Sequence, residues 1–213
     1  MKKVFFTASP MQDVLSQNGA DTPYKSVNNP KLQYDDACCF PIIPLINGYV
    51  DSGDDVYVYV VSTENHNMSQ KNYTEIEKRI LSLCAKKQVG TCAIKPIHIP
   101  FDDTVETHLA TFQKMIELVH DGDTVFADFT YQGRCLPIVE MMALNFAYRT
   151  YNNCSVECVV YGNKNFQTGE KFIYDQTSLF LMDQIVNELA KSKNQNPVKA
   201  IETILDINAS MEE

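Results

Sequence analysis

The chain has 213 residues and a net charge of −9, with 45% apolar and 21% charged residues. This length suits one ordinary domain, or one domain with a small appendage, and the composition is that of a globular protein with a substantial core. The negative charge excludes a general nucleic-acid coat, because such binding depends on many lysine and arginine contacts with phosphate. We therefore expect no DNA partner.

The N-terminal apolar run stops at Ser9 and Pro10, too early for a signal peptide. No run approaches the roughly 18 apolar residues that a membrane span needs, so we expect a cytoplasmic protein with no membrane partner. The seven cysteines show no CxxC or Cys/His ligand spacing. This favours reduced thiols over a zinc site or a disulfide framework, and we predict neither a metal nor a cofactor.

The first predicted strand is Lys3–Ala8, where three consecutive apolar residues indicate burial on both faces. Thr7 and Ser9 place hydroxyl groups at its carboxyl end. The polar segment 12–36 follows, and it is long for a connection within a domain. Simple disorder and a flap that covers a ligand are both consistent with it.

Residues 38–50 are expected to form a short buried helix, although Pro44 obscures where it begins. The remaining predicted strands are 56–62, 91–99, 124–129, 155–161 and 171–174, and the predicted helices are 69–87, 105–120, 136–151, 177–191 and 198–208. Strands that alternate with long helices indicate βαβ units. We therefore predict an α/β, Rossmann-like fold with a mostly parallel sheet, helices on both faces, and a C-terminal β-hairpin and helix. Residues 1–192 would form the ligand-binding domain and 193–213 a short helical tail.

The stretch 122–148 reads as a strand, a polar loop and a helix. In an open parallel sheet, ligands bind outside the carboxyl ends of the strands, where helix N-termini present free backbone N–H groups. The turn from Asp128 to Arg134 lies at such a junction. It combines a carboxylate, hydroxyl groups, an amide, a glycine and a guanidinium, so we place the candidate site there.

Residues 128–137 read DFTYQGRCLP, and this run resembles the signature of CRISPR-associated Rossmann-fold (CARF) proteins of the DxTHG group, usually Asp-x-Thr-His-Gly-Phe-Arg-x-Leu-Pro. The matching positions are Asp128, Thr130, Arg134, Leu136 and Pro137. The chain departs from the signature at Tyr131, Gln132 and Gly133, where His, Gly and Phe are usual. The order of elements is also similar to the family from residue 1 to about residue 190.

The resemblance implies a domain that binds cyclic oligoadenylates, the second messengers of type III CRISPR defence. Such domains form two-fold homodimers, and a ring with an even number of identical nucleotides can share that axis. Because we expect no conventional effector domain after Tyr161, the chain resembles the standalone ring nucleases. In these enzymes a ribose 2′-hydroxyl attacks the neighbouring phosphodiester without a metal and leaves a 2′,3′-cyclic phosphate, so the protein aligns the reacting atoms and stabilises charge on the phosphate.

For catalysis we expect Arg134, Lys164 and Ser9. The planar guanidinium of Arg134 suits bidentate contact with phosphate, although an ion pair with Asp128 is the alternative. Lys164 would stabilise the phosphorane or be a solvated surface lysine, and Tyr131 would stack on adenine or belong to the core. The predicted ligand-binding residues are Thr7, Ser9, Pro10, Met11, Gln12, Asp128, Thr130, Tyr131, Gln132, Gly133, Arg134, Gly162 and Asn163.

Two other functions stay open. A noncatalytic sensor or sponge would bind the same messenger and act through a separate partner. An unrelated Rossmann-like enzyme would bind a mononucleotide, but TASPMQ follows the first strand in place of a glycine-rich G-x-G-x-x-G or a P-loop lysine motif.

Overall fold

The computed structural model describes residues 1–17, 20, 22–131, 133, 135–192 and 196–211. Seven strands form one sheet in the order β2-β7-β6-β5-β1-β3-β4. The strands are β1 (Lys2–Ala8), β2 (Tyr24–Ser26), β3 (Asp55–Thr63), β4 (Thr91–Ile99), β5 (Thr124–Asp128), β6 (Ser155–Lys164) and β7 (Lys171–Asp175). Every pairing is parallel except that of β6 with β7, which forms the expected hairpin. The Rossmann-like α/β prediction is confirmed.

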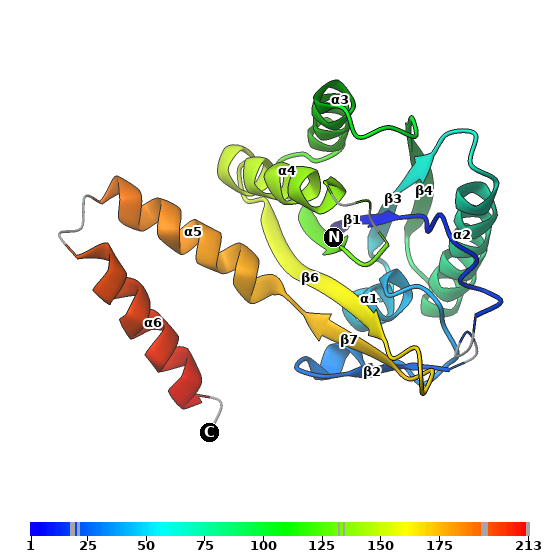
Figure 1. Ribbon diagram of the computed structural model, residues 1–213, viewed down its shortest axis with the longest axis horizontal. Helices are drawn as coiled ribbons and strands as arrows, with labels where there is room; N and C mark the ends of the chain where they lie inside the picture. Colours follow the sequence, from blue (N-terminus) through cyan, green and yellow to red (C-terminus); the bar gives the residue numbers. More distant parts are fainter. Residues whose placement is uncertain (18–19, 21, 132, 134, 193–195, 212–213) are drawn as a thin grey trace. The chain divides into compact units, whose positions relative to one another are not determined.

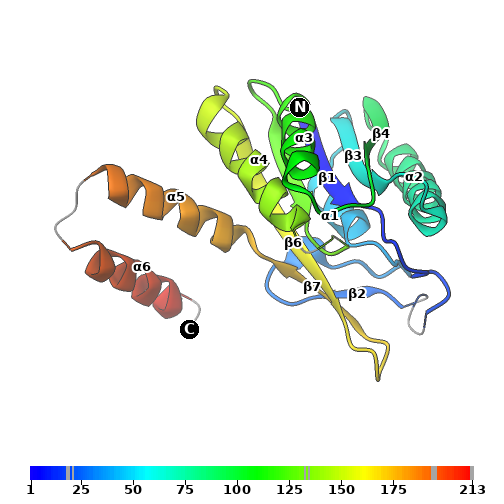
Figure 2. The same cartoon turned by 45° about the horizontal axis from the view of Figure 1, so that its top comes forward.

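Four helices cover this sheet: α1 (Ile42–Tyr49), α2 (Asn67–Lys87), α3 (Val105–Ile116) and α4 (Leu136–Thr150). The chain moves outward from β1 through β3 to β4, then returns across the sheet to β5 and β6. Because crossovers between parallel strands are nearly always right-handed, this reversal puts α1 and α2 on one face and α3 and α4 on the other (Figures 1 and 2).

The core follows from the apolar runs in the sequence. Val4, Phe5 and Phe6 of β1 are 0%, 0% and 1% exposed, because β1 is a central strand with helices on both faces. The Phe5 ring stacks on that of Phe126 in β5, with 4.5 Å between the ring centroids. On the face covered by α1 and α2, these two rings join a continuous apolar cluster that includes Ile76 and Ile80 of α2.

Neither disorder nor a simple flap describes the middle of segment 12–36. Residues 24–26 form β2, which pairs in parallel with β7 at the edge of the sheet. A 3-10 turn, η1 (Pro30–Leu32), follows it. Tyr24 and Leu32 are 2% and 0% exposed. Their side chains pack in the core and hold this otherwise polar segment against the domain.

Helix α1 begins at Ile42 rather than at residue 38. Pro44 is the third residue of the helix, and backbone N–H groups in the first turn have no partner within the helix. The proline therefore removes no helical hydrogen bond there. The prediction that 105–120 is helical also extends too far, since α3 ends at Ile116.

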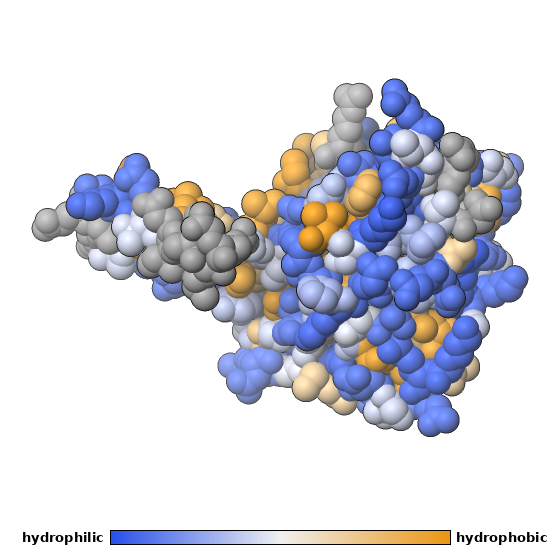
Figure 3. Space-filling model, turned by 90° about the horizontal axis from the view of Figure 1, so that it is seen from below, coloured by the Kyte–Doolittle hydropathy of each residue, from blue (hydrophilic) through white to orange (hydrophobic). Residues whose placement is uncertain are grey.

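The chain divides into two compact units, Met1–Thr177 and Ser178–Glu213, whereas the predicted boundary lies after residue 192. The second unit holds α5 (Thr177–Lys191), apart from its first residue, and α6 (Pro197–Met211). Figure 3 shows a largely hydrophilic face on which apolar areas stay small and separate, as is usual for the surface of a globular domain.

Candidate functional site

The candidate site lies where the strand order reverses. β1 pairs with β3 on one side and with β5 on the other, and the crossovers that leave this point go in opposite directions. In open α/β sheets, ligands bind at such switch points, outside the carboxyl ends of the strands. Here those ends are Ala8 and Asp128, so the fold brings together the two loops that the sequence predicts.

Asp128 is the centre of a buried hydrogen-bond network. Its Oδ2 atom accepts from the Thr7 hydroxyl over 3.0 Å, and its Oδ1 atom accepts from the backbone N–H and the hydroxyl of Thr130 over 3.0 and 2.5 Å. The Thr130 hydroxyl oxygen in turn accepts from the Gly162 N–H over 2.7 Å. We call these four residues the Asp128 network. It ties β1, β5 and β6 together beneath the site, so Asp128 shapes the loop from below.

Burial raises the pKa of Asp128 to about 6, although hydrogen bonds from Thr130, Thr7 and the Ile42 backbone oppose that rise. Ile42 is the first residue of α1, so the carboxylate also meets the positive end of a short helix. Asp128 is 1% exposed. Its ionisation therefore depends on the surrounding donors rather than on water.

This pKa predicts a pH dependence of stability. In the unfolded chain Asp128 titrates near 3.8 and in the folded chain near 6, so the folded state binds more protons between these values. The stabilisation from this group is full below about pH 4 and is lost as pH rises through about 6. Between about pH 4 and pH 6 we expect the free energy of unfolding of the natural protein to decrease relative to that of Asp128→Asn. Urea unfolding of both proteins at each pH measures the difference. A constant difference between the two proteins would contradict this assignment.

The two predicted loops enclose an open hollow of about 330 Å³ above the Asp128 network. It is lined by Pro10, Met11, Gln12, Thr130 and Tyr131, all of which the sequence predicts as ligand-binding. The side chain of Asn72, 0% exposed, fixes the first loop by donating to the carbonyls of Pro10 and Gln12 over 2.8 and 2.9 Å. The hollow is thus preorganised on its β1 side.

Tyr131 lies between the core and the hollow. Its hydroxyl donates to the Cys39 carbonyl over 2.8 Å, and its ring meets that of Phe40 edge-on at 6.4 Å. The pKa of Tyr131 is raised by burial. The hydroxyl is therefore engaged within the protein, while part of the ring lines the hollow.

Ser9 and Gly162 are both buried. The Ser9 hydroxyl donates to the Ser69 carbonyl, which fastens the end of β1 to α2. A Cβ atom on Gly162 would lie 2.4 Å from Pro41 Cγ, so close packing accounts for glycine at that position.

The other predicted residues are more dispersed. Lys164 Nζ donates to Gln17 Oε1 over 3.2 Å and lies 5.6 Å from the centroid of the Phe166 ring, and Lys164 is not among the residues that line the hollow. Asn163 is exposed on β6. Gly133 lines a second cavity beside the hollow. Gln132 and Arg134 lie outside the described residues.

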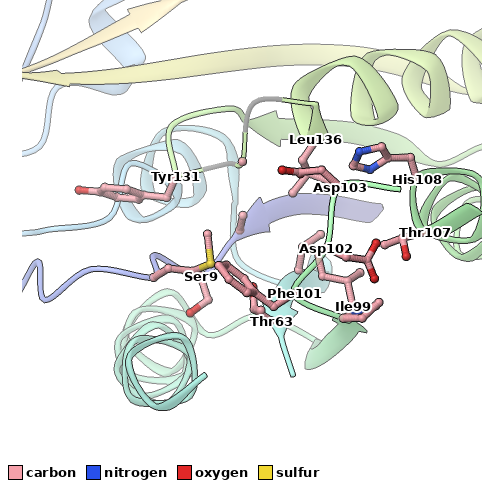
Figure 4. A pocket seen from close by; sticks show the side chains of 15 residues that line it. Ser9, Thr63, Ile99, Phe101, Asp102, Asp103, Thr107, His108, Tyr131 and Leu136 are labelled. Carbon is pink, nitrogen blue, oxygen red and sulfur yellow. The ribbon is translucent and has the colours of Figure 1, made fainter. Parts of the chain in front are cut away.

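The second cavity has a volume of about 170 Å³ and reveals residues that the sequence analysis missed. Its outer wall comes from the loop between β4 and α3, with Phe101, Asp102 and Asp103, and from His108 on α3 (Figure 4). In Figure 4 the Tyr131 side chain points away from these groups. The available signal was the run Pro100 to Asp103, which places aromatic and acidic side chains directly after a strand.

Within the described ranges, no three or more His, Cys, Asp or Glu side chains are arranged to hold a metal ion. In the same part of the chain no helix has the length and apolar character needed to cross a membrane. No model of a known protein family matches the chain, and a search of curated proteins finds no similar sequence.

Proposed function

We propose that this protein binds a cyclic oligoadenylate of type III CRISPR defence as a homodimer and cleaves the ring without a metal. The observation that carries the proposal is the hollow itself. Two loops that are separated by more than half of the chain meet at the switch point of the sheet, and their predicted residues line one open space. The resemblance of residues 128–137 to CARF proteins supplies the ligand class.

The chemistry of the hollow supports a nucleotide. None of the five described residues that line it carries a charge, and these five offer hydroxyl, amide and aromatic groups that can contact ribose, phosphate and base. The side chain of Cys135, which precedes the first helical residue of α4, makes no capping hydrogen bond. The N–H groups of Leu136 and Ile138 donate to the carbonyls of Gly133 and Cys135, so the positive end of the helix dipole is what favours phosphate at such a position.

The proposal is tested by incubating the full chain with cyclic tri-, tetra- and hexa-adenylate in EDTA, followed by chromatography and mass determination. We expect linear products that end in a 2′,3′-cyclic phosphate. Arg134→Ala and Lys164→Ala should lower the cleavage rate at least about tenfold, the scale expected for the loss of one charge-stabilising donor. Lys25→Ala is the matched control, because Lys25 is an exposed lysine that pairs with Glu170. Failure of the natural protein to bind any of the three rings would overturn the proposal.

A noncatalytic sensor is the second candidate, and one observation favours it. The Ser9 and Tyr131 hydroxyls both donate to backbone carbonyls of the protein, which leaves fewer free groups to act on the ribose or the phosphate. Tight binding with the intact ring recovered from the EDTA reaction would establish the sensor in place of the nuclease.

A further inference from the structure

Two cysteines, Cys84 of α2 and Cys92 of β4, lie close together where the helix leads into the strand. Helix α2 ends sharply, because Gln88 adopts the left-handed conformation with φ 56° and the Val89 N–H donates to the Cys84 carbonyl over 3.3 Å. Such a helix end reverses the direction of the chain within a few residues. Strand β4 therefore starts beside the last turn of α2, and Cys92 returns to the neighbourhood of Cys84.

Both side chains face the layer between α2 and the sheet. Cys92 pairs with Val56 of β3 in the parallel register, and residues paired in this way point to the same face of a sheet. Val56 and Cys84 belong to the apolar cluster on the face covered by α1 and α2, and Cys92 packs against that cluster. Cys84 is 2% exposed, whereas Cys92 is half-buried. Cys92 is thus the more accessible member of the pair.

A hydrogen bond joins the two thiols. The Cys84 S–H donates to the Cys92 sulfur, which lowers the pKa of Cys92, while the same bond and burial raise the pKa of Cys84. The thiolate is the form of cysteine that reacts with oxidants, and a lower pKa makes it more abundant at neutral pH. Burial instead raises the pKa of four other free cysteines, Cys38, Cys39, Cys154 and Cys158. Cys92 therefore differs from these four in its readiness to react.

We propose that Cys84 and Cys92 form a reversible disulfide when the protein meets a peroxide. The Cys92 thiolate attacks one oxygen of hydrogen peroxide and breaks the O–O bond, which leaves a sulfenic acid at Cys92 and releases hydroxide. The Cys84 sulfur then attacks the Cys92 sulfur, and the departing hydroxyl takes the Cys84 proton to become water. Together the two thiols lose two electrons and two protons, and the peroxide is reduced to two molecules of water.

The disulfide would tie the end of α2 to the outermost strand of the sheet. Strand β4 lies at the edge and pairs with β3, so a covalent link to α2 gives it a second attachment. Amide hydrogen exchange in β4 should therefore slow after oxidation and return to its original rate after reduction with dithiothreitol.

Oxidation of the full-length chain tests the pair directly. The protein is treated with hydrogen peroxide, its remaining thiols are alkylated, and its peptides are mapped by mass spectrometry. We expect a disulfide between Cys84 and Cys92 that dithiothreitol reverses. Cys38 and Cys39 are the internal control, because both are buried and their thiols donate to backbone carbonyls, so they should stay reduced. Recovery of Cys84 and Cys92 as free thiols, or oxidation of all four at one rate, would overturn the proposal.

Two variants test the separate roles of the thiols. In Cys84→Ser the hydroxyl can still donate to the Cys92 sulfur but cannot form a disulfide, so dimedone should trap the sulfenic acid of Cys92. In Cys92→Ser the labelling of Cys84 should be at least about tenfold lower, because its pKa is raised and it is buried. Cys154→Ser, which removes a buried thiol before β6, should still form the Cys84–Cys92 disulfide. Equal labelling of the first two variants would contradict the assignment of Cys92 as the attacking thiol.

Discussion

Asp128→Ala is expected to lower the free energy of unfolding by about 2–4 kcal/mol, the scale for leaving buried donors without an acceptor together with a small cavity. The carboxylate accepts from Thr7, from Thr130 and from the Ile42 backbone. Alanine leaves these donors without an acceptor in a place that water does not reach, and it also leaves a small void. Urea unfolding at pH 5, below the folded-state pKa of Asp128, measures the change.

Asp35→Ala is the matched control for that experiment. Asp35 is exposed and accepts one hydrogen bond from Gln33 Nε2, so its removal should change the free energy of unfolding by no more than about 0.5 kcal/mol. A loss of less than about 1 kcal/mol in Asp128→Ala would show that the Asp128 network does not hold the three strands together.

Gly48→Ala is expected to lower the free energy of unfolding by about 2–3 kcal/mol. Gly48 lies in α1, and a Cβ atom there would be 2.0 Å from the backbone carbonyl oxygen of Lys31. Because the obstacle is backbone, η1 must move away from α1, and overpacking of this kind costs about 1–3 kcal/mol or more. Alanine also favours the helix by up to about 1 kcal/mol, so the loss is smaller than the clash alone would cause.

The control for Gly48→Ala is Gly133→Ala, since a Cβ atom on Gly133 would have no neighbouring atom within 4 Å. Thermal unfolding of the two variants should differ clearly, with the midpoint of Gly48→Ala the lower. Limited proteolysis of Gly48→Ala should also cut within residues 24–36, where the natural protein is held. Equal midpoints for the two variants would contradict the close approach of α1 and η1.

Much of the fold follows from local patterns. The consecutive apolar residues of β1 predict a strand buried on both faces, and the helical periodicity of 136–151 predicts α4 to within one residue. The strand, loop and helix pattern also places the Asp128 to Arg134 turn at the carboxyl edge of the sheet, and the resemblance to CARF proteins adds the loop after β1 to the candidate site. The hollow lined by Met11, Gln12 and Thr130 is where that argument places it.

The rest depends on contacts that no local pattern shows. β2 is three residues of mixed polarity, and only its pairing with β7 makes it a strand. The sequence shows that Ser9 has a hydroxyl group, but it does not show that this group donates a hydrogen bond to the Ser69 carbonyl. His108 is one of four scattered histidines, and it lines the same cavity as Phe101 only because α3 packs against the sheet.

The pairing of β2 with β7 also bears on how the protein is made. Tyr24 pairs with Lys171, 147 positions later in the chain. At a synthesis rate of about 5–20 residues per second, β7 follows β2 out of the ribosome after roughly 7–30 s. For that time the nascent chain carries Tyr24 and the edge of β2 without their partner strand, while β3, β4, β5 and β6 are made one after another. Although β2 is made early, it therefore joins the sheet only after β7 has been made.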